Sequence, residues 1–179
     1  MPPVRACMHK FLSDAGTIVR VQTWDIDAPI PEAVEHFLGL SWSRETGTMV
    51  SGRGSSTVIC LGPSEWLVLG SGLHALVPVI ELDAAFAASS YRATDVSKAL
   101  VRIQVTGNAS CRLLGKGCSL DLDTGAFGVG AAARSRLAGI PAVIRRTGDF
   151  AFEVLVSRSY GEYLRAWLDD ACLEFDGVA

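Results

Sequence analysis

The sequence predicts an α+β fold made of two related βαβββα units, and two alignments within the chain predict it. Ile18–Gln22 (IVRVQ) and Leu100–Gln104 (LVRIQ) share one strand pattern at an offset of 82 residues. Gly62 and Gly148, each in the turn before a later strand, stand 86 residues apart. A nearly constant offset across successive elements is typical of an internal duplication. We therefore expect two such units to pack with approximate two-fold symmetry.

The composition supports one duplicated domain. Hydrophobic residues make up 49% and charged residues 20% of the 179 residues, which is enough apolar material for a core. We expect an N-terminal arm over residues 1–15 and a single duplicated domain over residues 16–179. Its halves lie at about 16–90 and 95–175. The mean hydropathy of +0.31 is high for a monomer, so part of the apolar surface is expected to contact a partner.

The first half contains a strand, a helix, three short strands and a helix. Alternating polar and apolar residues predict the first strand, and a proline at the first helical position with a following glycine bounds the first helix. Turn residues separate the next strands, and helically spaced apolar residues predict the last helix, which Pro78 interrupts. The expected segments are Thr17–Trp24, Pro31–Leu38, Thr48–Val50, Thr57–Leu61, Trp66–Leu69 and Leu73–Phe86.

The second half repeats this order. A strand precedes a short helix, two strands form a hairpin around Ala138-Gly139, a third strand follows, and a helix ends the unit. The final helix is expected to bury Tyr160, Tyr163, Leu164, Trp167 and Leu168. The expected segments are Ala99–Thr106, Gly107–Lys116, Arg134–Leu137, Ile140–Arg146, Phe150–Val156 and Arg158–Ala171.

Charge and cysteine content exclude several classes of protein. The formal net charge of −3 argues against a nucleic-acid-binding protein, and the missing aromatic-rich central strand argues against an RNA-binding module. No apolar stretch reaches the roughly 20 residues of a membrane span. The N-terminus carries several charged residues and does not read as a signal peptide. Five cysteines, an odd number without a Cys-x-x-Cys pair, indicate a reducing cytoplasm.

Few motifs carry chemistry. The glycine-rich stretch Gly125–Gly130 is read as a connecting loop rather than a phosphate cradle, because no clean strand precedes it and a weak helix start follows. His36 and Glu32 stand four residues apart on a helix, but a metal site needs three or four ligands, so a solvated helix surface is favoured. We therefore assign no catalytic, cofactor-binding or metal-ligating residue to this chain.

Two further features leave alternatives open. Cys111 and Cys118 lie near cationic residues, which lower a thiol pKa, but burial in a small space is the favoured reading. Asp95 precedes the second-half strand, where it caps a turn with Ser97 or accepts a hydrogen bond from a bound heterocycle. The turn role is favoured.

Basic residues gather late in the chain. Arg134, Arg136, Arg145 and Arg146 fall on the predicted hairpin and its neighbour, where they form either a solvated sheet face or a docking surface for an acidic partner. We assign them to a partner interface. The tryptophans at positions 24, 42, 66 and 167 are expected in the core, although an exposed tryptophan would suit an interface hot spot.

Several segments together resemble the gamma subunit of heterotetrameric sarcosine oxidase. The most specific are the Gly-Pro-x-Glu-Trp turn and the Lys-Gly-Cys-x-Leu-Asp run, and the likeness covers residues 15–175. The segments that carry it are Leu61–Leu69 (LGPSEWLVL), Asp95–Ser97 (DVS), Leu114–Leu122 (LGKGCSLDL), Ala133–Leu137 (ARSRL) and Phe152–Tyr160 (FEVLVSRSY), followed by Trp167-Leu168.

The resemblance implies a fold like the folate-binding fold of the glycine-cleavage aminomethyltransferase. It also implies that this chain has no cofactor of its own and packs directly against an alpha subunit with NAD-binding and folate-binding parts. A beta subunit would carry FAD, FMN would lie near the alpha–beta boundary, and a delta subunit would bind zinc. The complex would oxidise sarcosine to glycine and peroxide and pass the one-carbon unit to tetrahydrofolate. The family supplies no catalytic residue for this chain.

Three functional hypotheses remain at this stage. The first is an accessory, non-catalytic gamma subunit of a cytoplasmic sarcosine oxidase. The second is a stand-alone folate-binding or aminomethyl-transfer module, with Asp95 as its pteridine anchor. The third is a gamma-type subunit of an oxidase or dehydrogenase for another N-methyl amino acid. The missing catalytic constellation and the resemblance together favour the first.

Overall fold

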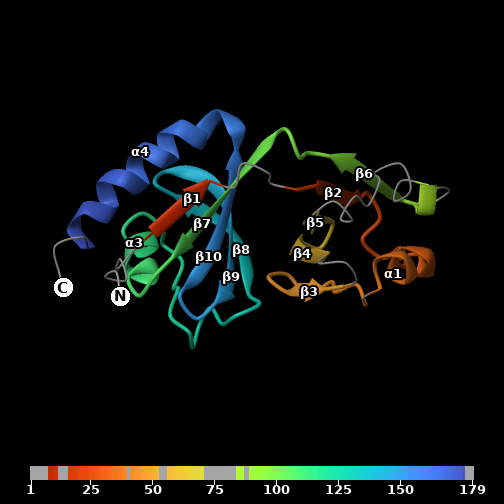
Figure 1. The fold of residues 1–179 in the computed structure, drawn as a ribbon. Helices are drawn as coiled ribbons and strands as arrows, with labels where there is room; N and C mark the ends of the chain where they lie inside the picture. Colours follow the sequence, from red (N-terminus) through yellow and green to blue (C-terminus); the bar gives the residue numbers. More distant parts are fainter. Residues whose placement is uncertain are drawn as a thin grey trace. The chain divides into compact units, whose positions relative to one another are not determined.

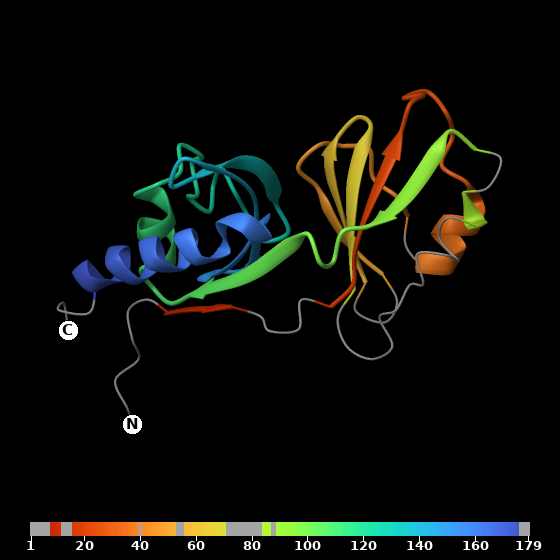
Figure 2. The ribbon, with the colours of Figure 1, turned by 90° about the horizontal axis from the view of Figure 1, so that it is seen from above.

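The computed structural model describes residues 8–11, 16–39, 41–52, 56–70, 84–86 and 89–175. The chain divides into two compact units. Residues 14–98 form the N-terminal unit, and residues 1–13 together with 99–179 form the C-terminal unit. Figures 1 and 2 show the ribbon from two directions. Each unit is built on a five-stranded sheet in which all neighbouring strands are antiparallel.

The N-terminal unit has its sheet in the order β3-β4-β5-β2-β6. Its core is rich in aromatic rings: Trp42 meets Trp66 edge-on at 5.8 Å between ring centroids, and Phe86 stacks on Tyr91 at 5.1 Å. Gly39, with φ of 63°, ends the helix in the left-handed conformation that favours glycine. The elements are β2 (Ile18–Thr23), α1 (Glu32–Leu38), β3 (Met49–Ser51), β4 (Thr57–Gly62), β5 (Glu65–Leu69) and β6 (Tyr91–Asp95).

The C-terminal unit has its sheet in the order β1-β7-β10-β9-β8. The β8–β9 hairpin turns at Ala138 and Gly139, whose φ angles of 51° and 81° are both positive, as a two-residue type I′ turn requires. The elements are β1 (Met8–Phe11), β7 (Leu100–Thr106), α3 (Ser110–Gly115), β8 (Ala132–Leu137), β9 (Ile140–Gly148), β10 (Ala151–Ser157), the 3₁₀ turn η2 (Arg158–Tyr160), α4 (Gly161–Cys172) and η3 (Leu173–Phe175).

Helices α3 and α4 cover one face of the C-terminal sheet. Leu113 of α3 and Leu164 and Leu168 of α4 are fully buried in one cluster with Ile103 and Val154 of the strands. Because side chains alternate along a strand, the neighbours of these strand residues lie on the opposite face. Leu164 and Leu168 of α4 are buried, as the sequence predicts for the apolar face of this helix.

The predicted helix face is wrong at its tyrosines. Tyr160 belongs to the turn η2 and not to α4, and Tyr163 lies within α4 but outside the buried cluster; both are exposed. The Tyr163 hydroxyl donates to the Ala138 carbonyl oxygen at 2.9 Å. Trp167 is partly buried and packs against the same cluster.

The predicted duplication is confirmed by the matching order of the two sheets. Strands β3, β4, β5, β2 and β6 correspond in order to β8, β9, β10, β7 and β1. Equivalent backbone bonds recur as well: Thr23 N–H donates to Ser64 O in the first unit, and Gly107 N–H donates to Phe150 O in the second, both at 3.0 Å. The α+β class and the strand–helix–strand order are therefore those that the sequence predicts.

Two edge strands, β1 and β6, were not predicted from the sequence. Each pairs with a strand other than the one that follows it along the chain. Strand β1 precedes β2, yet it pairs with β7, with Met8 opposite Thr106. Strand β6 precedes β7, yet it pairs with β2, with Thr23 opposite Tyr91. The predicted arm over residues 1–15 thus contains a strand of the C-terminal sheet. The division between the units falls between Lys98 and Ala99, beside the start of the predicted second half.

Most of the predicted helix Leu73–Phe86 lies outside the described residues, which resume at residue 84 with one helical turn. Within the described part of the chain, no helix is long and apolar enough to cross a membrane.

Candidate partner interface

Arg134 and Arg136 lie on β8, an edge strand of the C-terminal sheet. Burial alternates along this strand, with both arginines exposed and Leu137 buried. The Arg136 guanidinium donates to the carbonyl oxygen of Gly139 in the adjoining turn. Pairing with β9 sets Arg134 opposite Val143 and Arg136 opposite Pro141, so both arginines project from the sheet face opposite to α3 and α4. The structure therefore leaves both positions accessible to a partner.

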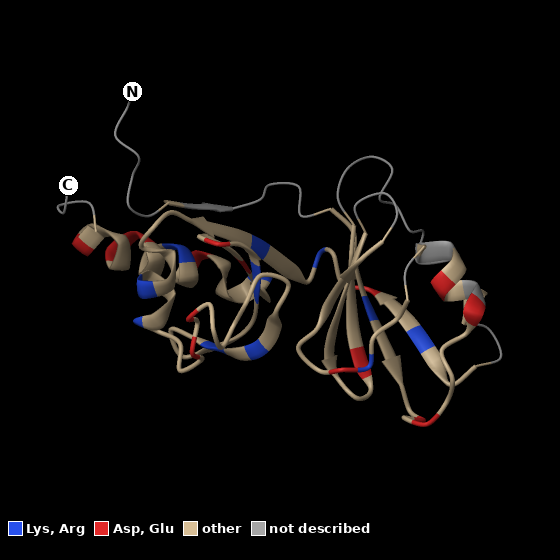
Figure 3. Ribbon diagram, turned by 90° about the horizontal axis from the view of Figure 1, so that it is seen from below, with Lys and Arg blue, Asp and Glu red and all other residues tan. Residues whose placement is uncertain are grey.

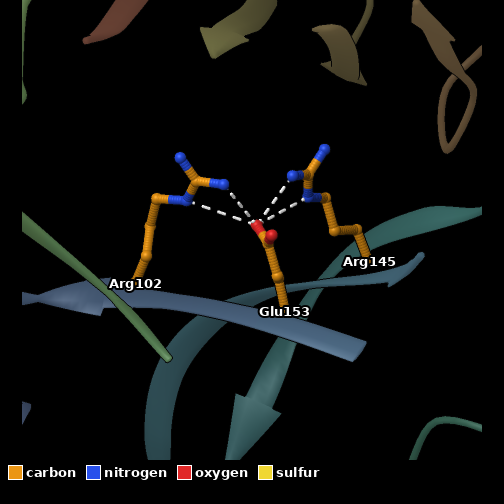
Figure 4. Close-up of polar contacts among 3 residues, drawn as sticks. All are labelled: Arg102, Arg145 and Glu153. Carbon is orange, nitrogen blue, oxygen red and sulfur yellow. Dashed lines mark hydrogen bonds and ion pairs between the residues drawn. The ribbon is translucent and has the colours of Figure 1, made fainter. Parts of the chain in front are cut away.

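Arg145 shares that sheet face but is buried, which argues against its predicted place in a partner interface. It is 7% exposed, and together with Arg102 it holds the carboxylate of Glu153 (Figure 4). One carboxylate oxygen, Glu153 Oε2, accepts from Nη2 of Arg102 at 2.8 Å and from Nη2 of Arg145 at 2.7 Å. The Nε groups of the two arginines lie at 3.2 and 3.0 Å from the same oxygen.

Burial governs the electrostatics of this cluster. Desolvation lowers the pKa of Arg145, and the charge and hydrogen bonds of Glu153 oppose that shift. A guanidinium stays protonated in proteins, so Arg145 remains a cation held by a carboxylate. The alternating pattern of the hairpin indicated which face Arg145 occupies. That pattern could not indicate that Glu153, on the neighbouring strand, would form an ion pair with Arg145.

Arg146 is also buried, and its hydrogen bonds within the C-terminal unit argue against its predicted place in a partner interface. It is 3% exposed, and its guanidinium ties the preceding loop to the β9–β10 turn. Its Nη1 group donates to the carbonyl oxygens of Leu122 and Phe127, both at 3.0 Å. Its other groups donate to Gly148 and Asp149 carbonyl oxygens. The hydrogen bonds of the Arg146 guanidinium are thus made within the C-terminal unit.

The same bonds decide the character of the glycine-rich loop Gly125–Gly130. A phosphate cradle needs converging backbone N–H groups. Here, the Arg146 guanidinium donates to the carbonyl oxygen of Phe127 in the loop and to that of Leu122 before it, so the carbonyl groups accept from a cation of the chain itself. The loop is followed by the edge strand β8 and not by a helix. The stretch belongs to the connection between α3 and β8, which agrees with its interpretation as a connecting loop.

Asp95 takes the turn role. Its carboxylate accepts from the Ser97 N–H at 2.8 Å and from the Ser97 hydroxyl at 2.5 Å. These two bonds hold the pKa of the Asp95 carboxyl below its ordinary value. Because the carboxylate is already engaged by its own turn, the structure gives no support to a pteridine anchor at this position.

The remaining candidates are structural or exposed. Cys118 is buried beside the Ser135 hydroxyl at 3.4 Å, and Cys111 is half-buried, so the favoured reading of burial holds. His36 and Glu32 are exposed on α1, as a solvated helix surface requires. Among the residues that the structure describes, no group of three or more histidine, cysteine, aspartate and glutamate side chains is placed to hold a metal ion.

Trp24 departs from the expected core position. Trp42 and Trp66 are buried, whereas Trp24 is 70% exposed in the loop between β2 and α1. The core is the default expectation for tryptophan, but alternation along β2 buries Val21 and Thr23 and places Trp24 on the side of the more exposed Gln22. The strand ends one residue earlier, at Thr23, and the turn signal Asp25–Asp27 that follows was the available sign that Trp24 belongs to the loop.

Comparisons with known proteins identify the family. The model of the sarcosine oxidase, gamma subunit family matches residues 24–174. The sarcosine oxidase subunit gamma of Arthrobacter sp. is 33% identical over 141 residues, covering 77% of this chain and 67% of that one. The corresponding subunit of Corynebacterium sp. (strain P-1) is 32% identical over 146 residues, covering 80% and 70%.

Solved structures give the same result for the fold. A chain of the heterotetrameric sarcosine oxidase from Corynebacterium sp. U-96, in complex with pyrrole 2-carboxylate, superposes with a TM-score of 0.87 at 26% identity. That match covers 99% of this chain and 89% of the other. Glycine cleavage system aminomethyltransferase T from Bartonella henselae matches with a TM-score of 0.63 at 14% identity, over 94% and 47% of the two chains. The second match concerns the fold alone.

Proposed function

Because this chain belongs to the sarcosine oxidase gamma subunit family, we propose that it is the accessory, non-catalytic gamma subunit of a heterotetrameric sarcosine oxidase. It packs against the alpha subunit and stabilises a complex that also contains beta and delta subunits. The observation that carries the proposal is the structural likeness to a heterotetrameric sarcosine oxidase chain across 99% of this chain.

The use of the buried charged groups agrees with an accessory role. The Glu153 carboxylate is shared by Arg102 and Arg145, and Arg146 fastens a loop of its own unit. Charged groups that are fully engaged by structure are not available to take up or deliver protons for a reaction. As the family resemblance implies, the proposed activity of the complex is oxidation of sarcosine to glycine with transfer of the one-carbon unit to tetrahydrofolate, and it is assigned to the partner subunits.

The cofactors belong to the same proposal. FAD, FMN, NAD, tetrahydrofolate and zinc are assigned to the alpha, beta and delta subunits, and none to this chain. The reducing cytoplasm is the proposed location, and the thiols of Cys60, Cys111 and Cys118 support it.

Co-expression tests the proposal directly. The alpha, beta and delta subunits would be produced with and without this chain, and the complex isolated through a tag on alpha. We expect this chain to co-purify, and we expect sarcosine-dependent peroxide formation to fall or the complex to dissociate when it is omitted. A complex with full activity and full stability without this chain would contradict an accessory role.

The exposed arginines of β8 supply a finer test. Charge reversal by Arg134→Glu with Arg136→Glu is expected to weaken co-purification while leaving the unfolding temperature nearly unchanged. Arg165→Glu, at an exposed position of α4, is the matched control. Equal recovery of the double variant and of the control would remove these two residues from the interface.

A further inference from the structure

The loop between β2 and α1 exposes two large apolar side chains that are separated by one residue in the sequence. Trp24 is 70% exposed and Ile26 is 55% exposed. Asp25 and Asp27 alternate with them and are exposed too. In Figure 3 this loop shows acidic residues at the end of the N-terminal sheet. A tryptophan left in water is costly, and tryptophan is enriched at the residues that dominate binding energy.

The loop backbone is held from inside the unit. The Thr23 hydroxyl accepts from the Asp25 N–H at 3.1 Å, and the Asp25 carboxylate accepts from the Asp27 N–H at 3.1 Å. The Arg44 guanidinium donates to the carbonyl oxygens of Ile26 and Ala28. These bonds fix the backbone while the Trp24 and Ile26 side chains remain outside.

Tyr91 completes the support. The Tyr91 hydroxyl donates to the Ala28 carbonyl oxygen at 2.9 Å. The Arg44 guanidinium lies 5.9 Å from the ring centroid of Trp66, so both side chains that hold the loop contact the aromatic core. Burial raises the pKa of Tyr91, with Arg44 opposing the shift, and the phenol therefore remains a donor at neutral pH. A contact surface that is ordered in advance loses little entropy on binding.

We propose that Trp24 and Ile26 are apolar anchors that bind a partner protein, in a cleft that is apolar at its centre and basic at its rim. The two carboxylates decide the chemistry. Asp25 and Asp27 repel the phosphates of nucleic acids and of anionic lipid surfaces, and they attract lysine and arginine side chains. The inference rests on the proposed function, and it commits to the alpha subunit as the partner.

A second copy of this chain is a poorer occupant. The loop is acidic, whereas the exposed arginines of β8 form a different patch, so self-association would join two unlike surfaces. Unlike surfaces generate rings or open filaments and not a closed pair. A subunit that occupies one place in a heterotetramer needs a surface that fits one other subunit.

Binding of the purified full-length chain to purified alpha subunit tests the inference by surface plasmon resonance. The variant Trp24→Ser is expected to weaken the affinity at least about 30-fold, the size of a hot-spot loss. Leu173→Ser is the matched control, because Leu173 is 68% exposed in the other unit, and it should leave the affinity unchanged. Both variants should unfold at the wild-type temperature.

A charge variant tests the basic rim. Asp27→Lys is expected to slow association about tenfold at low salt and to reduce the dependence of the rate on salt. Asp25 is left in place, because its carboxylate holds the Asp27 N–H.

The outcomes separate the two proposals. If the wild-type chain does not bind alpha, both the proposed function and this inference fail. If the wild type binds and Trp24→Ser binds equally well, the inference alone is overturned. Self-association of the isolated chain that Trp24→Ser abolishes, without any effect on alpha binding, would also overturn it.

Discussion

The buried charge cluster of the C-terminal unit makes a sharp prediction about stability. The variant Glu153→Gln keeps the size of the side chain and removes the charge that lies between Arg102 and Arg145. In the structure, one carboxylate oxygen receives N–H groups from both guanidiniums, at distances from 2.7 to 3.2 Å, in a place about one-tenth exposed. Removal of one member of a buried ion pair costs about 3–5 kcal/mol, since the opposite charge stays buried.

The assay is urea unfolding followed by far-ultraviolet circular dichroism. Glu153→Gln should lose about 3–5 kcal/mol, and Arg134→Gln, on the same sheet face but exposed, should change stability by less than about 0.5 kcal/mol. The triple variant Arg102→Met, Arg145→Met, Glu153→Leu should be more stable than Glu153→Gln, because it buries no charge at all. A single variant within about 1 kcal/mol of wild type, or a triple variant less stable than the single one, would refute the reasoning.

Three further predictions concern packing and one carboxyl group. Gly117→Ala should cost about 1–3 kcal/mol by overpacking, because an added Cβ would lie 2.7 Å from the Trp167 ring and 2.9 Å from a backbone nitrogen. Gly115→Ala, with open space around its Cβ, should be neutral or stabilising by up to about 1 kcal/mol. Thermal and urea unfolding compare the two, and equal stabilities would contradict the overpacking. Trp167→Ala should cost about 2–3 kcal/mol in urea unfolding, below the value for full burial, because Trp167 is only partly buried. A loss under about 1 kcal/mol would place the ring outside the core. Ser97→Ala should raise the pKa of Asp95 part of the way to its ordinary value, as followed by carboxyl NMR titration. The lowered pKa stabilises the native state above the unfolded-state pKa, and this stabilisation disappears as pH falls through the native pKa; an unchanged titration midpoint in the variant would contradict the hydrogen-bond cause.

The elements that sequence reasoning finds are those with a local cause. Pro31 and Gly39 bound the first helix, and the turn Gly62–Glu65 joins two strands, because proline and glycine restrict or free the backbone wherever they stand. The duplicated strand Ile18–Gln22 gives the register between the two halves. These signals are local: they do not depend on contacts with residues that are distant in the sequence.

The arginines show where local reasoning stops. Alternation along the hairpin separates the exposed Arg134 and Arg136 from their buried neighbours, but Arg145 alternates in the same way and is nevertheless buried. Its burial depends on Glu153, which follows a turn and belongs to the next strand. The Arg146 guanidinium donates hydrogen bonds to carbonyl oxygens of residues up to 24 positions earlier in the chain. No spacing rule along one strand contains that information.

The exchanged edge strands are the largest feature that the sequence did not reveal, and they alter how the duplication should be understood. Met8 and Tyr91, the first residues of β1 and β6, stand 83 residues apart, close to the offset of the predicted repeat. Each repeat therefore begins with its own edge strand, and that strand completes the sheet of the other repeat. Because an edge strand covers unpaired backbone groups of its neighbour, neither repeat, counted from its own edge strand, contains all the strands of one sheet. A cut between Lys98 and Ala99 would leave β6 with the other four strands of the N-terminal sheet, but it would remove β1 from the C-terminal sheet, so the C-terminal fragment would lack an edge strand.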